Sequence, residues 1–278
     1  MEQKISIKKG TIEETLVLPL WGRAYETQKE NPRLTDQKAL EIIGVIDYDF
    51  SEIERTQGMS QHGWVSRSLH TDKTARLFIE KHPEATIVNI GCGLDTTFSR
   101  IDNGKILFYE LDLPDVIKLR KHFYEESDRH QNIASSFLET EKWFTKINVR
   151  DGLLFLAGGV FYYFVEKQIK EFFAATAEHF KNCDIFFDSL SPMGMKFAKK
   201  AVLKKGGMGM SLEGGWGLKS AKSLEQWDER IKVIDVIPFS KDMKKGIPLS
   251  LRMISIITDM LGISSMVHLR IESPVHQG

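Results

Sequence analysis

The chain has 278 residues, of which 42% are hydrophobic and 27% charged, a composition typical of a globular protein and unlike that of a disordered one. Lys and Arg together number 38, as do Asp and Glu, so no excess of positive charge points to a nucleic-acid partner. The first residues are polar and lysine-rich, and no apolar stretch reaches about 18 residues. We therefore expect a cytoplasmic protein with no membrane partner.

Helix-like periodicity fills residues 11–82, which we expect to form an N-terminal helical cap. Breaks fall at Asn31-Pro32, at Gly44 and at Gln57-Gly58, with no convincing strand pattern between them. From residue 83 onward, short apolar runs alternate with longer periodic segments, which indicates β-α units on a mainly parallel sheet. We predict an α/β protein, one structural domain overall, with a cap of residues 1–82 and a core of residues 83–278.

Seven apolar runs in this core are candidate strands. They cover residues 86–90, 105–111, 132–138, 152–157, 184–188, 232–238 and 266–271. Between the fourth and fifth runs, residues 166–180 place Ile169, Phe172 and Phe173 at helical spacing, which predicts a helix that covers the sheet.

Three further expectations concern glycines, the C-terminus and cysteines. Glycines cluster in residues 206–217, which predicts a loop, either a lid over a site or a plain solvent loop. The residues from Glu272 onward are expected to fray. The two cysteines, Cys92 and Cys183, lie in apolar runs, so we expect them to be buried and not joined in a disulfide.

The first strand of the core runs into a glycine turn, Gly91-Cys92-Gly93, that leads into a helix. Glycine lets the backbone approach a ligand where a Cβ would collide, and the start of a helix supplies unpaired amides. A dinucleotide fingerprint has a third glycine three residues after the second, but Thr96 stands there, which argues against a pyrophosphate. A plain strand-to-helix connection stays open as the alternative.

Glu110 falls near the end of the second strand, 17 residues after Gly93. A carboxylate at about this distance suits a ribose, because it can accept charge-assisted hydrogen bonds from both hydroxyls. Glu110 is therefore the ribose candidate, and a solvated acid at a strand end is the alternative.

The fourth strand ends in Gly158-Gly159, and an aromatic cluster follows. Ligands bind at the carboxyl edge of a parallel sheet, where aromatic faces can receive an adenine or a sulfonium cation. We expect the rings of Phe161 and Phe164 to belong to the core, whereas the hydroxyls of Tyr162 and Tyr163 need partners.

Four separated blocks resemble the leucine carboxyl methyltransferase family, which includes bacterial polyketide O-methyltransferases. The blocks are residues 18–26, residues 66–72, residues 89–96 with 110–114, and residues 159–163. The resemblance implies a seven-stranded class I methyltransferase sheet with an antiparallel last strand and N-terminal helices that form a lid. It also implies an O-methyltransferase that uses S-adenosyl-L-methionine and releases S-adenosyl-L-homocysteine.

The family's motif positions imply roles for particular residues. Gly91 and Gly93 would pass under the methionine part, Arg67 would pair with the cofactor's carboxylate, and Ser136 with Phe137 would contact the adenine. The expected cofactor-binding residues are Arg67, Gly91, Cys92, Gly93, Asp95, Glu110, Leu111, Ser136, Phe137, Gly158 and Gly159.

The resemblance also suggests residues on the acceptor side. Arg23 can bind either the cofactor's carboxylate or an acidic substrate, and it is a substrate candidate together with Tyr162. Asp72 can orient Arg67 through a salt bridge or be a plain surface acid. Two positions depart from the family pattern: Gly158 stands where many relatives have an acid, and Ser136 stands where an aspartate often contacts the adenine.

Methyl transfer from a sulfonium mainly requires alignment of the acceptor and exclusion of water, and we expect no metal. A carboxylate acceptor is already ionised, whereas a hydroxyl calls for a base, for which Tyr163, Asp188 and His62 are candidates. Asp188 can instead cap the turn after its strand, and His62 can be an ordinary polar residue of the cap. The acceptor is either a small molecule, such as a polyketide-like compound, or a protein C-terminus.

Two rival functions share these features. An NAD-dependent oxidoreductase has the same strand, glycine turn and acid. A catalytically silent module that binds S-adenosylmethionine would explain Gly158 and Ser136 as signs of decay. The sequence does not indicate an oligomeric state.

Overall fold

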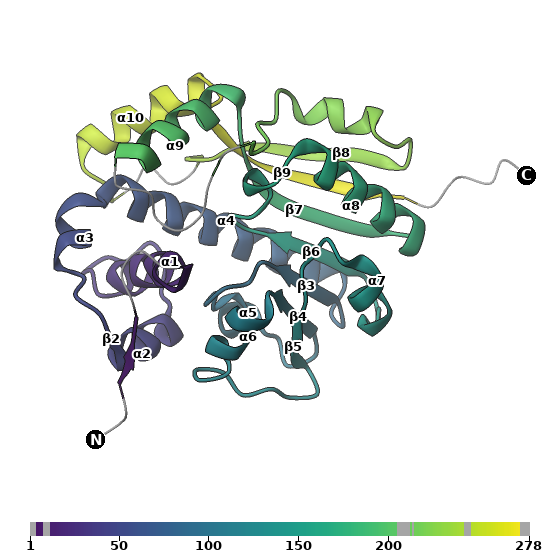
Figure 1. The fold of residues 1–278 in the computed structure, drawn as a ribbon, viewed down its shortest axis with the longest axis horizontal. Helices are drawn as coiled ribbons and strands as arrows, with labels where there is room; N and C mark the ends of the chain where they lie inside the picture. Colours follow the sequence, from purple (N-terminus) through teal and green to yellow (C-terminus); the bar gives the residue numbers. More distant parts are fainter. Residues whose placement is uncertain (1–3, 8–11, 205–211, 213, 242–245, 273–278) are drawn as a thin grey trace, which may run out of the picture.

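A seven-stranded sheet forms the centre of the structure, a computed structural model that describes residues 4–7, 12–204, 212, 214–241 and 246–272 (Figure 1). The strands lie in the order β5-β4-β3-β6-β7-β9-β8. Their bounds are β3 Thr86–Ile90, β4 Leu107–Asp112, β5 His130–Ala134, β6 Leu153–Ala157, β7 Cys183–Leu190, β8 Ile231–Pro238 and β9 Ser264–Ile271. Pairs from β5 to β7 are parallel, whereas β9 runs antiparallel to β7 and β8. The predicted α/β class, the seven strands and the reversed last strand are confirmed.

The order of the strands reverses its direction between β3 and β6. From β3 the chain adds β4 and β5 on one side, and then returns to place β6 on the other side of β3. In open α/β sheets a ligand crevice forms outside the carboxyl ends of the strands at such a point. The turn after β3 and the turn after β6 are therefore the structural neighbours from which a site is built.

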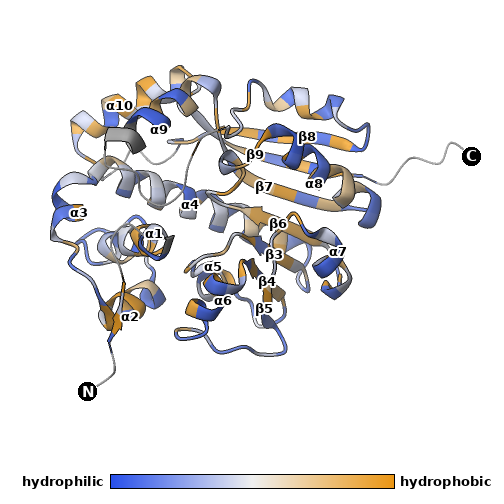
Figure 2. Ribbon diagram, in the orientation of Figure 1, coloured by the Kyte–Doolittle hydropathy of each residue, from blue (hydrophilic) through white to orange (hydrophobic). Residues whose placement is uncertain are grey.

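Helices cover both faces of the sheet, because alternate side chains of each strand point to opposite faces. On one face, Phe172 and Phe173 of α8 (Glu166–His179) pack in one cluster with Phe155 of β6. On the other face, Phe78 of α4 (Gly58–Lys81) packs in a cluster with Leu154 of β6. Figure 2 shows the apolar colours concentrated on the central strands. The predicted helix over residues 166–180 is confirmed.

The N-terminal part consists of α1 (Ile12–Thr27), α2 (Gln37–Val45), α3 (Ser51–Thr56) and α4. Val17, Leu20 and Ile42 pack there in one cluster with Leu94 and Tyr124 of the core. A short parallel ladder of β1 (Ile5–Ser6) and β2 (Ile46–Asp47) also occurs, so the expectation of no strand before residue 83 was wrong. Two-residue strands are too short to leave a periodic pattern. The division at residue 82 stays a prediction.

The remaining helices connect the strands. They are α5 (Thr97–Ile101), α6 (Pro114–Arg120), α7 (Thr140–Trp143), α9 (Pro192–Lys204) and α10 (Leu249–Met260), with short 3-10 helices at Phe144–Lys146, Phe161–Tyr163 and Ala221–Gln226. Cys92 and Cys183 are buried and free, as predicted. The predicted glycine-rich loop falls largely outside the described residues, as does the tail beyond Glu272.

Among the described residues, no helix has the length and apolar character that crossing a membrane requires.

Candidate functional site

The turn after β3 requires glycine at two positions. Gly91 and Gly93 have φ angles of +62° and +50°, in the left-handed region that other residues rarely adopt. A Cβ added at Gly91 would lie 2.5 Å from Cγ2 of Val160, and one at Gly93 would lie 3.0 Å from Cδ2 of Leu16. The bare backbone therefore allows the turn after β6 and the cap helix α1 to approach this turn closely.

Glu110 lies behind this turn and is fully buried. Its carboxylate accepts hydrogen bonds from Nη2 of Arg120 and from Nδ2 of Asn89, and Nε2 of His130 lies 3.1 Å from Oε1. Because Glu110 is fully buried and these partners enclose both oxygens, the geometry argues against Glu110 as the ribose ligand. Leu111 is also fully buried, and its carbonyl oxygen accepts from the amides of Gly91 and Cys92.

Arg120 connects Glu110 to the turn. Its Nη1 donates to the carbonyl oxygen of Gly93 at 3.1 Å and to that of Asp95 at 2.8 Å. The guanidinium also lies 3.9 Å from the ring centre of Tyr124. A completely buried arginine is tolerated only when its charge is paired in this way. The function of Glu110 is therefore to neutralise the side chain that holds the turn.

Asp112 is the carboxylate that reaches the open edge of the sheet. It is the last residue of β4 and is half-buried, with Oδ2 2.8 Å from the amide of Gly93 and Oδ1 2.7 Å from that of Leu113. Burial raises the pKa of Asp112 above its ordinary value, although the two amides act in the opposite direction. Sequence reasoning missed Asp112, because the expected strand stopped one residue earlier. The Glu-Leu-Asp alternation, which puts two acids on one face, was the available signal.

The turn after β6 gathers a second group of polar side chains. Nε of Arg67, on α4, donates to Oδ2 of Asp188 at 2.9 Å, and its Nη2 donates to the hydroxyl of Tyr162 at 3.1 Å. The amide of Gly159 donates to Oδ1 of Asp188 at 2.6 Å. A Cβ at Gly158 would lie 3.1 Å from Cδ of Arg67. Position 158 thus carries no acidic side chain, and the aliphatic part of Arg67 occupies the space that such a side chain would take.

This arrangement bears on two of the candidate bases. Burial raises the pKa of the Tyr163 and Tyr162 phenols above their ordinary value, so both keep their protons at neutral pH. Asp188 has both oxygens engaged, one by Arg67 and one by Gly159. The geometry therefore makes Asp188 a positioning carboxylate for the arginine, and it argues against a tyrosinate base.

His62 lies elsewhere on α4. It is buried, with Nδ1 2.7 Å from Nη1 of Arg33 and Nε2 3.4 Å from the Ser255 hydroxyl of α10. Burial, aided by the charge of Arg33, lowers its pKa from 6.5 to about 4. The structure does not bring His62 to the group around Arg67, so its candidacy as a base is not supported by geometry.

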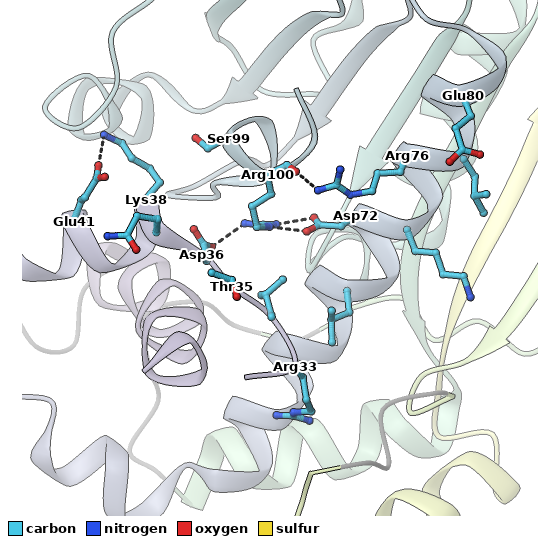
Figure 3. A pocket seen from close by; sticks show the side chains of 15 residues that line it. Arg33, Thr35, Asp36, Lys38, Glu41, Asp72, Arg76, Glu80, Ser99 and Arg100 are labelled. Atoms are coloured by element: carbon cyan, nitrogen blue, oxygen red, sulfur yellow. Dashed lines mark hydrogen bonds and ion pairs between the residues drawn. The ribbon is translucent and has the colours of Figure 1, made fainter. Parts of the chain in front are cut away.

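The cap is fixed to the core by a buried charge network (Figure 3). Arg100 of α5 donates to both oxygens of Asp72, at 2.7 and 2.8 Å, and to Oδ2 of Asp36 at 2.8 Å. Nε of Arg23 donates to the same Oδ2 at 2.8 Å. Asp72 therefore pairs with Arg100, and the suggested salt bridge from Asp72 to Arg67 is wrong.

Arg23 and Asp95 link this network to the glycine turn. Nη2 of Arg23 donates to the carbonyl oxygen of Leu94 at 3.3 Å and lies 3.6 Å from Oδ1 of Asp95. Burial alone would raise the pKa of Asp95, but the guanidinium groups of Arg23 and Arg100 lower it to about 2. Arg23 is nearly inaccessible, which favours a role beside the cofactor turn over contact with an acceptor.

Two other predicted contacts have defined surroundings. Ser136 and Phe137 follow β5, which ends at Ala134, earlier than predicted. The Phe137 ring is buried in the core and packs edge-on against Phe164 at 4.7 Å between ring centres. Ser136 is half-buried, and its hydroxyl accepts from the amide of Leu138 at 3.3 Å. Of the two residues, Ser136 is the more accessible to a ligand at this edge.

An open groove of about 770 Å³ borders the charge network, and Asp36, Asp72 and Arg100 are among the residues that line it (Figure 3). Residues from the segment before α2, from α4 and from α5 line it, among them Lys38, Arg76 and Arg100. The residues that line the groove include no glycine of the turn after β3 or of the turn after β6. It is therefore distinct from the carboxyl edge at which the site residues meet.

Comparison with known proteins agrees with this fold. The family model for leucine carboxyl methyltransferase matches residues 16–177. The tetracenomycin polyketide synthesis O-methyltransferase TcmP of Streptomyces glaucescens is 32% identical over 79% of this chain and 80% of its own length. The S-adenosyl-L-methionine-dependent methyltransferase dpfgK of Gibberella zeae is 26% identical over 77% of each chain.

A solved structure also has this fold. The plantazolicin methyltransferase BamL, in complex with S-adenosylhomocysteine, superposes with a TM-score of 0.50 at 11% identity, over 94% of this chain and 97% of its own. The family match and the relative TcmP identify the chain as an S-adenosylmethionine-dependent methyltransferase, and the sheet order agrees with this class. The chain belongs to the leucine carboxyl methyltransferase family.

The residues at the carboxyl edge fit the cofactor of this family. Asp112 offers a carboxylate that suits a ribose diol, and Arg67 offers a planar guanidinium that suits the carboxylate of an amino acid. Asp112 contacts the first glycine turn through the amide of Gly93, and Arg67 lies against the second turn at Gly158 and Gly159.

Lowering the pH should destabilise the protein through His62. Because its pKa is about 4 in the folded state and 6.5 otherwise, the unfolded chain takes up a proton that the folded chain excludes. Stability is lost as the pH falls below 6.5, by about 2 kcal/mol at about pH 5. Urea unfolding of the wild type and of His62→Gln across this pH range measures the effect. The free energy of unfolding should fall less steeply with decreasing pH in the variant than in the wild type.

The exposed His122 provides a matched control, and His122→Gln should leave the acid dependence as in the wild type. Equal slopes for the wild type and His62→Gln would contradict the assignment.

Proposed function

We propose that the chain transfers the methyl group of S-adenosylmethionine to an oxygen of a small-molecule acceptor that is already ionised, either a carboxylate or an acidic phenol. The observation that carries this proposal is the state of the polar groups beside Arg67. Tyr162 and Tyr163 hold their protons, and both oxygens of Asp188 are engaged. A neutral alcohol would find no positioned base there among the described residues, whereas an anionic oxygen needs none.

Other observations support the choice of acceptor class. The relative TcmP, 32% identical to this chain, is by name a polyketide O-methyltransferase. A protein C-terminus is the second acceptor class, since the family is named for leucine carboxyl methylation. NAD-dependent oxidation is disfavoured by Thr96, which is buried and whose hydroxyl lies 2.5 Å from Oδ2 of Asp36.

The mechanism assigns this chain's residues to binding, alignment and exclusion of water. When bound, S-adenosylmethionine supplies an activated methyl group. Asp112 would hold the ribose by accepting its hydrogen bonds, and Arg67, oriented by Asp188, would pair with the cofactor's carboxylate. Holding the acceptor oxygen in line with the methyl group then contributes most of the rate, and the cap keeps water away.

Replacing Asp112 with Asn should weaken S-adenosylhomocysteine binding by about tenfold or more, because the ribose loses a charged acceptor. Isothermal calorimetry measures this directly. Asp115→Asn, at an exposed position three residues away, should bind as the wild type does. Glu110→Gln should instead lower the melting temperature, because Arg120 loses its charged partner. Unchanged affinity in folded Asp112→Asn would contradict the ribose assignment.

Asp188→Asn should reduce affinity for S-adenosylhomocysteine by about tenfold while leaving the pH profile of kcat unchanged, because the change loosens Arg67 and removes no base. Asp184→Asn is the matched control. It removes a paired carboxylate from the other end of β7 and should leave cofactor affinity intact. If the variant instead lost one pH-dependent limb of the kcat profile and kept normal cofactor affinity, Asp188 would be a general base. That result would contradict its assignment as a positioning residue for Arg67.

A methyl-transfer assay tests the proposed function itself. Tritium from labelled S-adenosylmethionine should be transferred when aromatic acids or acidic phenols are offered as acceptors. It should not be transferred when the acids are offered as methyl esters, the phenols as methyl ethers, or when neutral alcohols are offered. Peptides with a free or an amidated C-terminus test the second class. Transfer to the free peptides alone would move the function to protein carboxylates. Tight S-adenosylhomocysteine binding without transfer to any acceptor would favour a silent binding module.

A further inference from the structure

Helix α10 has its apolar side chains on the outside. Its buried residue is Ser255, whereas Leu249, Met253, Ile254, Ile257 and Met260 are 73%, 50%, 44%, 51% and 82% exposed. A surface helix of a globular protein normally shows the opposite arrangement, with its apolar stripe toward the core. The spacing of four, four and three residues from Leu249 to Met260 aligns the exposed residues in a stripe.

The neighbouring helix α9 extends this surface. Met193 and Phe197 of α9 are 45% and 57% exposed, and they stand one helical turn apart. The two helices meet closely, since a Cβ at Gly194 would lie 2.3 Å from the carbonyl oxygen of Ile263, just after α10. Figure 1 shows α9 and α10 side by side. An apolar patch contributed by two adjacent elements marks an interaction site more strongly than scattered apolar residues do.

The exposed charged side chains of the two helices, among the residues that the structure describes, have one sign. Lys196, Lys200 and Arg252 are exposed and Lys199 is half-buried. The sequences of the two helices contain a single acid, Asp259, whose Oδ1 accepts from the amide of Ser240 while its Oδ2 is enclosed. Apolar side chains flanked by lysine and arginine are the pattern of helices that lie in the interface of an anionic membrane.

We propose that α9 and α10 form a docking surface for an anionic lipid membrane. A second copy of the chain fits less well, because it would bring like charges together across the contact. The helices would lie flat, with Met260 and Leu249 among the acyl chains and the lysines at the headgroups. The expectation of no membrane partner rests on the lack of a long apolar stretch, which a helix lying flat does not need.

The position of this surface relates it to the site, although the proposal does not depend on the proposed function. Helix α9 follows the carboxyl end of β7, and Ser264, four residues after the end of α10, pairs with the last residue of that strand, Leu190. Asp188 lies two residues before the end of β7. The membrane-facing helices therefore adjoin the carboxyl edge, where an apolar acceptor dissolved in lipid could be received.

Sedimentation with vesicles tests the proposal on the full chain. The protein should pellet with vesicles of phosphatidylcholine mixed with phosphatidylserine, should bind vesicles of phosphatidylcholine alone much more weakly, and should be released by salt. The double variant Ile257→Asn with Met260→Asn should lower the bound fraction at limiting lipid by about tenfold or more. Val149→Asn, which changes a residue of similar exposure before β6, is the matched control and should bind as the wild type does.

Charge is tested separately. Lys196→Glu with Lys200→Glu should lower binding to the mixed vesicles by at least about fivefold per lysine, whereas Lys167→Glu on α8 should not. Melting temperature and S-adenosylhomocysteine affinity verify that each variant is folded. Absence of sedimentation, or equal binding to both lipid compositions, would overturn the proposal. A dimer by light scattering that the α10 variant dissociates, without vesicle binding, would overturn it in favour of a second copy.

Discussion

The buried guanidinium of Arg120 is the constraint on which the site depends. No part of its side chain reaches solvent, so its charge must be met inside the protein, by Glu110 and by the carbonyl oxygens of Gly93 and Asp95. These two carbonyl groups belong to the turn with positive φ angles, which the amide contacts of Gly91 with Leu111 and of Gly93 with Asp112 also hold. The ion pair of Arg120 and Glu110 therefore helps to fix the bend of this glycine segment. The same pair leaves Glu110 enclosed by protein groups.

A second set of charges relates the cap to this bend. Asp36, at the start of α2, accepts from Arg23 of α1 and from Arg100 of α5, and Arg100 also holds Asp72 of α4. Cap and core are thus joined by buried ion pairs. Burying these charges costs desolvation free energy, which their mutual attraction offsets only while all partners are present. Because the same guanidinium groups lower the pKa of Asp95 to about 2, the carboxylate beside the turn stays ionised at any physiological pH. The turn therefore has the ionised carboxylate of Asp95 on one side, and on the other side Asp112, whose pKa is raised by burial.

The fold could be predicted from the sequence to a large extent, because hydrophobic runs of strand length mark each of the seven strands. The site could be predicted only by region. Glu110 and Asp112 point to the same face of β4, and which one stays open is decided by Arg120, which comes from the following helix. The partner of Arg67 is 121 residues away in the sequence, and no periodicity or spacing indicates such a pairing. The partner of Asp72 was predicted wrongly for the same reason, since Asp72 and Arg67, five residues apart on α4, pair with Arg100 and with Asp188, respectively.

The electrostatics of the proposed reaction explain why the enzyme needs a cap and no positioned base. An anionic oxygen and a sulfonium cation neutralise each other as the methyl group moves, so the transition state carries less separated charge than the reactants. Water stabilises the reactants more than such a transition state, and its exclusion therefore lowers the barrier. Leu16 and Leu20 of α1 supply the apolar cover beside Gly93 and Leu94, and the tyrosines remain neutral in the same dry environment. The burial that makes the phenols poor bases is thus the burial that makes an ionised acceptor reactive.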